Sequence, residues 1–268
     1  MSENQMAQPS NTPNLFFWTL NTLLGIVFLA EILILRSSAA LDAATITLAA
    51  IVSVATLNRQ LPLQNVLLAA LMAALIGGIA HGLSANPNFS IPFGPVVFNP
   101  ACGAKFFNAV PWTIPLLWIV AIFNARGMAR LILRPWRMVK NYGFWLIGLT
   151  AGLAVAFDLA LEPFAWQVKH FWLWQPTKLA VNWQGTPLLN FFGWLFVSLL
   201  ILAFATPSFI RKQPGQSSAP DYHPLAVWLG AFLLFAVGSA KAGLWPAVGS
   251  DVAIAAVTSV FAIRGAKW

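Results

Sequence analysis

Long apolar runs separated by short polar connections make up most of the chain. About eight of these runs approach the roughly 20 residues that a helix needs to cross a bilayer. They are continuous rather than alternating residue by residue, so they predict helices and not the strands of a barrel. The fold class that we predict is an all-α, polytopic transmembrane helical bundle. The predicted spans are approximately Leu15 to Leu35, Ala39 to Leu57, Leu63 to Gly82, Trp112 to Leu133, Gly143 to Glu162, Pro187 to Thr206, Pro224 to Ala242, and Trp245 to Ile263.

The segments outside the spans are a polar start and three longer connections. Residues 1–14 are polar and are expected to be a disordered N-terminus, followed by a single integral membrane domain over residues 15–268. The connections Leu83 to Pro111 and Pro163 to Thr186 are rich in Pro, Gly, Asn and Trp, and long non-helical segments are often functional. The third, Pro207 to His223, is typical of a flexible linker.

Composition supports a membrane location. The chain has 268 residues, of which 59% are hydrophobic and 8% are charged, whereas a soluble domain carries about 25% charged residues. A net charge of +8 can indicate a nucleic-acid partner, but here the basic residues lie in short loops between apolar runs, as membrane topology requires. We therefore expect no nucleic-acid partner. The single Cys102 excludes a disulfide within the chain and a Cys-based metal site.

The distribution of basic residues also predicts an orientation. The loop from Arg126 to Lys140 contains five basic residues and no acid. Basic loops face the cytoplasm, so this end of the bundle is expected there. With eight spans, both termini are then cytoplasmic, and both of the longest connections lie on the opposite side.

The first candidate for chemistry is the segment FDLALEPFAW. Asp158 and Glu162 are four residues apart and therefore share one helix face. Pro163 is expected to end the helix, which would put both acids in its last turn. The negative end of the helix dipole and the like charges disfavour two ionised carboxylates. One acid can then keep a proton at neutral pH, as a general acid must. Alternatively, both acids reach toward headgroups or pair with nearby basic side chains.

The second candidate is the segment HFWLWQPTKLAVNWQGTPLLNFFGW. Pro187 is expected in the first turn of the next span, with Asn190 one turn inside it. The segment is either an interfacial aromatic belt or a cavity whose ring faces meet a cationic or polyene ligand. The residues that we expect to contact such a ligand are Trp172, Trp174, Asn182, Trp183, Gln184, Asn190 and Trp194, together with Trp112 from the preceding connection.

That preceding connection, IPFGPVVFNPACGAKFFNAVPWTIPLLW, contains five prolines. The chain is expected to be extended or turning until Trp112. The connection is either a plain external loop or a lid or re-entrant element. Two further ionisable pairs are expected to be structural: Glu31 with Arg36, and Asp251 with Lys241.

Three stretches together resemble a known family. FGPVVFNPACGAKFFNAVPWTIPLLW, FDLALEPFAW and WQGTPLLNFFGW are similar in order and spacing to the bacterial and archaeal carotenoid biosynthesis membrane proteins. Characterised members of this family are carotenoid hydratases of the CruF type, including the bisanhydrobacterioruberin and γ-carotene hydratases. The resemblance runs from about Phe93 to Trp194, and the outer spans match only in hydropathy. One departure is that Glu162–Pro163 stands where the family pattern has Asp-Pro, so the acid reaches one methylene further.

The resemblance implies a carotenoid hydratase in a prokaryotic plasma membrane. The implied reaction adds water to the terminal double bond of a linear carotenoid ψ end group, gives a tertiary alcohol, and needs no metal or redox cofactor. The implied partners are a carotenoid from the lipid phase, membrane lipids, and other carotenoid-synthesis enzymes.

The residues suggest roles for this chemistry. Asp158 or Glu162 would protonate the alkene, and the other acid, ionised, would stabilise the cation and take a proton from water. The Trp rings would offer cation–π contacts, and Asn190, Asn182 or Gln184 would hold the water.

Two other classes of function remain open from the sequence. A transporter or proton-coupled channel also uses intramembrane acids and broken helices, although the acids here cluster near helix ends and no inverted repeat is visible. A non-catalytic subunit that binds carotenoid as a scaffold is the other alternative. No Asp-rich diphosphate site of the DDxxD kind occurs, so Mg²⁺-dependent prenyl transfer is not expected.

Overall fold

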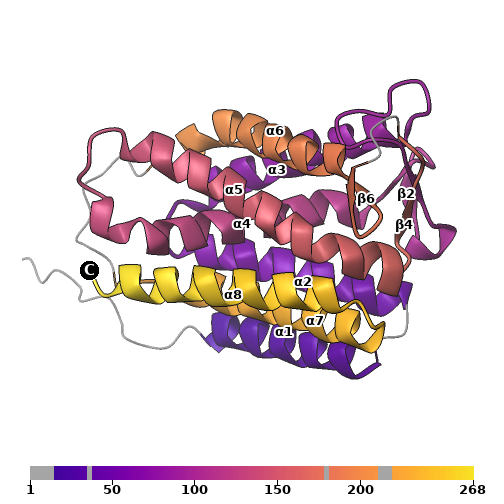
Figure 1. Ribbon diagram of the computed structural model, residues 1–268. Helices are drawn as coiled ribbons and strands as arrows, with labels where there is room; N and C mark the ends of the chain where they lie inside the picture. The colour runs from indigo at the N-terminus through magenta and orange to yellow at the C-terminus, as the bar shows by residue number, and fades with distance from the viewer. Residues whose placement is uncertain (1–14, 35–37, 178–180, 211–218) are drawn as a thin grey trace, which may run out of the picture.

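The computed structural model describes residues 15–34, 38–177, 181–210 and 219–268. Within these ranges, eight helices are long and apolar enough to cross a membrane, which confirms the predicted all-α bundle (Figure 1). The predicted disordered segment 1–14 lies outside the described residues, as do residues 211–218 of the predicted linker. The helices are α1 Leu15–Ile34, α2 Ala39–Asn58, α3 Leu63–Ala85, α4 Thr113–Ile132, α5 Tyr142–Pro163, α6 Leu188–Ala205, α7 His223–Lys241 and α8 Trp245–Ala266.

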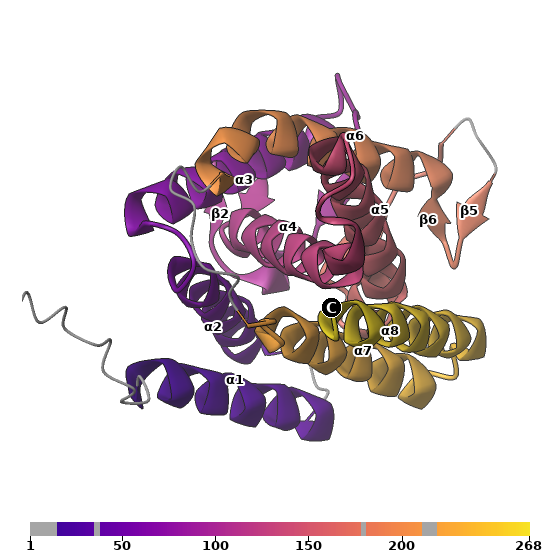
Figure 2. The same cartoon turned by 90° about the vertical axis from the view of Figure 1, so that its left-hand side faces the viewer.

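Helix α4 lies at the centre of the bundle, packed against α2, α3, α5, α7 and α8 (Figure 2). It is the most buried of the eight spans and also the least apolar. The outer helices need long apolar side chains toward lipid, whereas a central helix is surrounded by protein and is free of that demand. Gly77 on α3 and Gly265 on α8 allow close approach, since an added Cβ would collide with the Trp118 ring and the Leu131 carbonyl of α4, respectively.

The two longest connections meet at one end of the bundle, opposite the C-terminus (Figure 1). Strand β1 (Val96–Phe98), from the first connection, pairs antiparallel with β4 (Trp172–Trp174), from the second. Two small hairpins complete this end: β2 (Lys105–Phe106) with β3 (Val110–Pro111), and β5 (Asn182–Trp183) with β6 (Thr186–Pro187). The prediction that both connections share one side is therefore confirmed, while the identity of that side stays a prediction.

The Pro-rich first connection is anchored in the bundle and is more than a plain loop. Phe93 is fully buried; its ring stacks on His81 of α3 at 4.3 Å and lies 6.0 Å from the Trp118 ring of α4. Its backbone N–H donates to Ser84 Oγ at 3.0 Å. Phe93 thus packs the first connection against α3 and α4 and fixes its position at this end of the bundle.

Helix α5 ends at Pro163, as expected, but the helical path does not stop there. The chain continues from α5 into a π-helical turn, η3 (Phe164–Val168). Pro163 has no N–H for the Leu159 carbonyl four residues earlier, but the Trp183 indole N–H donates to that carbonyl at 3.2 Å. The freed acceptor is thus satisfied by a side chain from β5. Asp158 and Glu162 consequently lie well before the end of the helical segment, with protein on all sides.

Candidate functional site

Asp158 and Glu162 lie on one face of α5, as predicted, and both are buried. Asn190 of α6 joins them: its Nδ2 lies 2.5 Å from Asp158 Oδ2 and 3.3 Å from Glu162 Oε1. Asn190 is itself fully buried, one turn inside α6. Asp158 Oδ1 and Asn190 Oδ1 are buried and have no hydrogen-bond partner among the described residues. The acids and the amide therefore form one cluster between two helices.

Glu162 is also held by the strands above it. Its Oε2 accepts hydrogen bonds from Trp174 Nε1 at 2.8 Å, Thr186 Oγ1 at 3.0 Å and Trp172 Nε1 at 3.2 Å. Two predicted Trp residues thus reach the predicted acid, by their N–H groups rather than by their ring faces. Thr186 was missed by the sequence reasoning, although it stands in the GTPLLN stretch four residues before Asn190.

The other predicted ligand contacts have structural partners. In the β5–β6 hairpin, Asn182 Oδ1 accepts from the Gly185 N–H at 3.2 Å. The carbonyl of Gln184, not its amide, accepts from Gln167 Nε2 at 2.7 Å and Trp166 Nε1 at 3.2 Å.

Trp183, in the same hairpin, donates its indole N–H to the Leu159 carbonyl of α5, as described above. On α6, one turn after Asn190, Trp194 stacks on Trp118 with ring centroids 4.1 Å apart. Trp112 is half-buried immediately before α4, and is not among the residues bonded to the acid pair.

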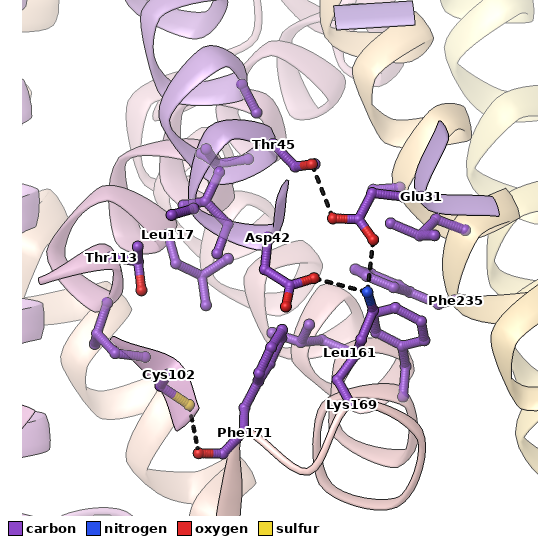
Figure 3. A pocket seen from close by; sticks show the side chains of 18 of the residues that line it. Glu31, Asp42, Thr45, Cys102, Thr113, Leu117, Leu161, Lys169, Phe171 and Phe235 are labelled. Carbon is purple, nitrogen blue, oxygen red and sulfur yellow. Dashed lines mark hydrogen bonds and ion pairs between the residues drawn. The ribbon is translucent and has the colours of Figure 1, made fainter. Parts of the chain in front are cut away.

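A mostly apolar pocket lies beside the acid pair, between α1, α2, α4, α5 and α7 (Figure 3). Its lining runs from Ala39 to Ala49 on α2 and from Val227 to Phe235 on α7, which at about 1.5 Å per residue is a length of roughly 12–15 Å. Asp158 and Glu162 are not lining residues. Trp172 is shared, because it lines the pocket while its N–H bonds to Glu162. The aromatic lining residues are Phe28, Phe157, Phe164, Phe171, Trp172 and Phe235.

One end of this pocket is charged. Lys169, which directly follows η3, contacts Glu31 Oε2 at 2.6 Å and Asp42 Oδ1 at 2.7 Å. Thr45 Oγ1 lies 3.0 Å from Glu31 Oε1. Sequence reasoning missed this cluster and expected Glu31 to pair with Arg36, which lies outside the described residues. Glu31 is instead bonded to Lys169, because α1, α2 and η3 converge at this end.

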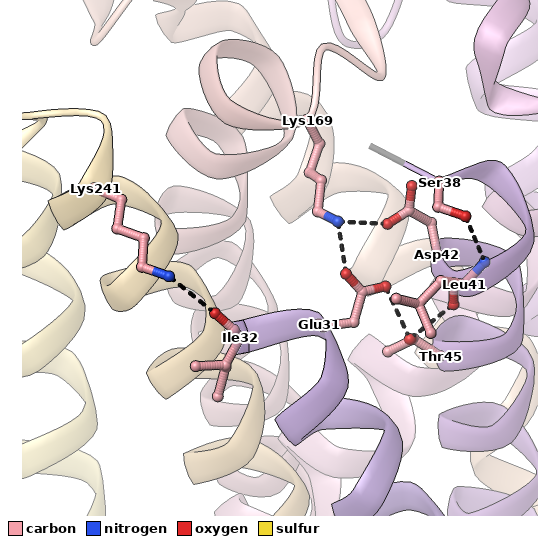
Figure 4. Close-up of polar contacts among 8 residues, drawn as sticks. All are labelled: Glu31, Ile32, Ser38, Leu41, Asp42, Thr45, Lys169 and Lys241. Carbon is pink, nitrogen blue, oxygen red and sulfur yellow. Dashed lines mark hydrogen bonds and ion pairs between the residues drawn. The ribbon is translucent and has the colours of Figure 1, made fainter. Parts of the chain in front are cut away.

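The expected pair between Asp251 and Lys241 does not form. Lys241 Nζ donates to the Ile32 carbonyl at the end of α1, at 3.2 Å (Figure 4). Both carboxyl oxygens of Asp251 are buried without a hydrogen-bond partner among the described residues. Helix α7 packs against α1 as well as α8, and the end of α7 carries Lys241 to the α1 side.

Cys102 also lines the pocket. Its Sγ donates to the Phe171 carbonyl at 2.9 Å, and burial raises the pKa of its thiol to about 11. The thiol is therefore protonated at neutral pH and reacts slowly with electrophiles.

No group of three or more His, Cys, Asp or Glu side chains within the described ranges could hold a metal ion.

Comparison with known proteins gives one match. A family model described as carotenoid biosynthesis protein matches residues 17–258, which include α2 to α7 in full, most of α1 and about the first two thirds of α8. Searches of curated proteins and of solved structures gave no match. The matched segment holds the acid pair, the indoles and the charged pocket. The chain belongs to the carotenoid biosynthesis protein family, as an integral membrane member with eight candidate spans.

Proposed function

We propose that this family member is a hydratase that adds water to the terminal double bond of a linear carotenoid. A proton joins the less substituted alkene carbon, and a tertiary cation forms at the carbon that bears two methyl groups. Water adds to that carbon and releases a proton, so one water is consumed and the product is a tertiary alcohol. The protein must supply an acid, a base and a setting that stabilises a cation.

The observation that carries this proposal is the buried acid pair that is bonded to an indole of the apolar pocket. Its described hydrogen bonds come from neutral donors, namely two indoles, a hydroxyl and an amide. Neutral donors stabilise one negative charge in such a site better than two adjacent ones. We assign the charge to Glu162, which accepts four of these bonds, and a proton to Asp158, whose Oδ1 is free to carry it.

Trp172 connects the pair to the pocket. Ionised Glu162 accepts the indole N–H, which places negative charge at the edge of a ring that lines the pocket. A cation over a desolvated aromatic ring gains about 2 kcal/mol. The pair thus supports the cationic stage of hydration through Trp172, and five Phe rings line the same pocket.

The pocket suits a rod-shaped apolar substrate. Its lining extends along the helices and is mostly apolar, as binding of a long polyene requires.

The main alternative, proton-coupled transport, has less support. Proton transport requires ionisable groups across the membrane thickness, whereas the buried acids of the described residues lie toward one end of the bundle. These acids are Glu31, Asp42, Asp158, Glu162 and Asp251.

Expression in a lycopene-producing bacterium, followed by mass analysis of the pigments, tests the proposal. The expected result is a gain of one water per modified end. Unchanged pigment, with the protein present in the membrane, would contradict it.

Variants of the acid pair separate its two possible roles. D158N is expected to abolish hydration if Asp158 gives the proton, and to leave a slower reaction if the pair only stabilises the cation. Wild-type hydration rates in both D158N and E162Q would exclude the pair from the reaction.

A further inference from the structure

The charged end of the pocket consists of side chains from three separate segments. Glu31 lies in the last turn of α1, Asp42 lies in the first turn of α2, and Lys169 follows the π turn after α5. Their side chains are almost completely buried, with exposed fractions of 2% for Glu31, 9% for Asp42 and 1% for Lys169. Buried charges are costly unless they are matched. The burial of three ionisable groups from distant parts of the chain in an apolar pocket therefore indicates a functional role for the cluster.

Among the described residues, the cluster contains two carboxyl groups and one ammonium group. If all three were ionised, the pocket would hold a net negative charge with little water to stabilise it. One carboxyl group can remove this excess by carrying a proton, and a transient cation in the pocket can do the same. The composition of the cluster thus matches a reaction that begins with a protonated acid and passes through a cation.

The contacts indicate which carboxyl group carries the proton. Both oxygens of Glu31 have a polar neighbour: Oε2 contacts Lys169, and Oε1 lies near the Thr45 hydroxyl, which is also 2.9 Å from the Leu41 carbonyl. Asp42 contacts Lys169 through Oδ1. Its other oxygen points away from Lys169, into the space between Leu117 and Phe171 (Figure 3). Leu117 and Phe171 both line the pocket, so a proton on this oxygen faces the ligand space.

We propose that this pocket holds the end group of the linear carotenoid and that Asp42 is the residue that protonates it. This inference rests on the proposed hydration and adds a second acid site, in direct contact with the substrate space. The Asp42 O–H bond breaks as the alkene electron pair forms the new C–H bond. Water then forms the C–O bond at the tertiary cation, and its proton returns to the Asp42 carboxylate, which completes the balance.

The surroundings of Asp42 support both halves of this cycle. Asp42 lies in the first turn of α2, where the positive end of the helix stabilises the carboxylate that remains after donation. Lys169 holds that carboxylate in place, while Glu31 keeps Lys169 neutralised. Phe171 and Trp172 line the same pocket, and aromatic rings stabilise a nearby cation. Glu31 and Lys169 are positioning residues in this scheme.

Three variants test the assignment in the lycopene-producing host. D42N leaves a balanced Glu31–Lys169 pair, so it is expected to fold. E31Q leaves Asp42 as the carboxyl group in contact with Lys169 among the described residues, which keeps Asp42 ionised and unable to donate. Both are expected to lose hydration by about 100-fold or more, the size of a general-acid contribution. T47V is the control, since Thr47 lies on the same helix, donates to the Ala43 carbonyl of that helix, and is not among the pocket-lining residues.

Cys102 provides a second readout that is independent of activity. It is the only cysteine and lines the pocket, so bound lycopene should slow its alkylation by iodoacetamide at alkaline pH. The experiment uses purified full-length protein in lipid nanodiscs, with and without lycopene. Wild type and D42N are both expected to show protection of about fivefold or more, because D42N removes a proton donor and leaves the apolar contacts that bind a polyene.

The outcomes separate this inference from the proposed function. Hydration by D42N within a few-fold of wild type, with D158N inactive, would overturn the role of Asp42 and leave the proposed function intact. Alkylation of wild-type Cys102 that is unaffected by lycopene would overturn the pocket. If wild type adds no water to any pigment, the proposed function itself fails, whatever the alkylation shows.

Discussion

At the scale of single residues, Glu162 holds together more of the site than any other side chain. It accepts hydrogen bonds from β4, from β6 and from α6 while it stands on α5. In an apolar setting, a donor that loses its acceptor costs about 1–3 kcal/mol. Glu162 therefore has a structural contribution that exists whether or not its charge takes part in chemistry.

This contribution predicts a stability change. E162Q is expected to lower the free energy of unfolding by about 1–3 kcal/mol, because an amide cannot accept on both sides at once and its NH₂ group faces existing donors. Thermal unfolding in detergent measures the effect. T150V is a matched control, since Thr150 is buried on the same helix and donates to the Leu146 carbonyl of that helix. Equal melting temperatures for E162Q and T150V would show that the donors find other partners.

At the scale of elements, the passage from α5 to η3 shows a proline accommodated within a helix. The Leu159 carbonyl, freed by Pro163, accepts the Trp183 indole N–H. The β5–β6 hairpin in turn rests on the π turn through the Gln184 carbonyl. Helix and hairpin are thus mutually dependent, and together they fix the position of Thr186 next to Glu162.

A double-mutant cycle tests this dependence. W183F is expected to destabilise the protein by about 1–3 kcal/mol, because the Leu159 carbonyl is left without a donor. In a P163A background the backbone N–H is restored, and the same W183F substitution should cost less. The measurement is again thermal unfolding. An identical cost in both backgrounds would mean that the indole stabilises the fold by packing alone.

The sequence predicts the elements better than it predicts the contacts between them. Apolar run length defined the spans, and the i, i+4 spacing placed Asp158 and Glu162 on one face, because both signals are local. Glu31 and Lys169 are 138 residues apart, and no local pattern links them. The π turn was missed because its stability depends on a donor from another segment. Trp183 and Gln184 were predicted to contact a ligand. In the structure the Trp183 indole donates to the Leu159 carbonyl, and the Gln184 carbonyl accepts from the side chains of Trp166 and Gln167.

At the scale of the whole molecule, the bundle is organised around α4. Close contacts at glycines bring α3 and α8 against it, as small residues do in membrane helix packing.

The basic residues of the α4–α5 connection lie at the opposite end from the strands. A fluorescent protein fused to the C-terminus should therefore fluoresce, if this basic end is cytoplasmic as predicted, whereas a phosphatase fusion should be inactive.

Glycine substitutions test the packing around α4. G77A is expected to destabilise the protein by about 1–3 kcal/mol, because the new methyl group collides with the Trp118 ring. G152A, on α5, is the control: its Cβ meets no heavy atom within 4 Å, and alanine is the better helix former by up to about 1 kcal/mol. A G77A protein as stable as G152A would show that α3 and α4 can separate slightly at no cost.

The pocket is closed by charge at one end, and this has a kinetic consequence for substrates with two identical ends. Under the proposed function only one end of the polyene can reach the acid in a single binding event. The molecule must leave, reverse its direction in the bilayer and bind again before its second end reacts. Hydration of lycopene should then be distributive: the singly hydrated pigment accumulates first, and the doubly hydrated product follows after a lag that shortens as enzyme concentration rises.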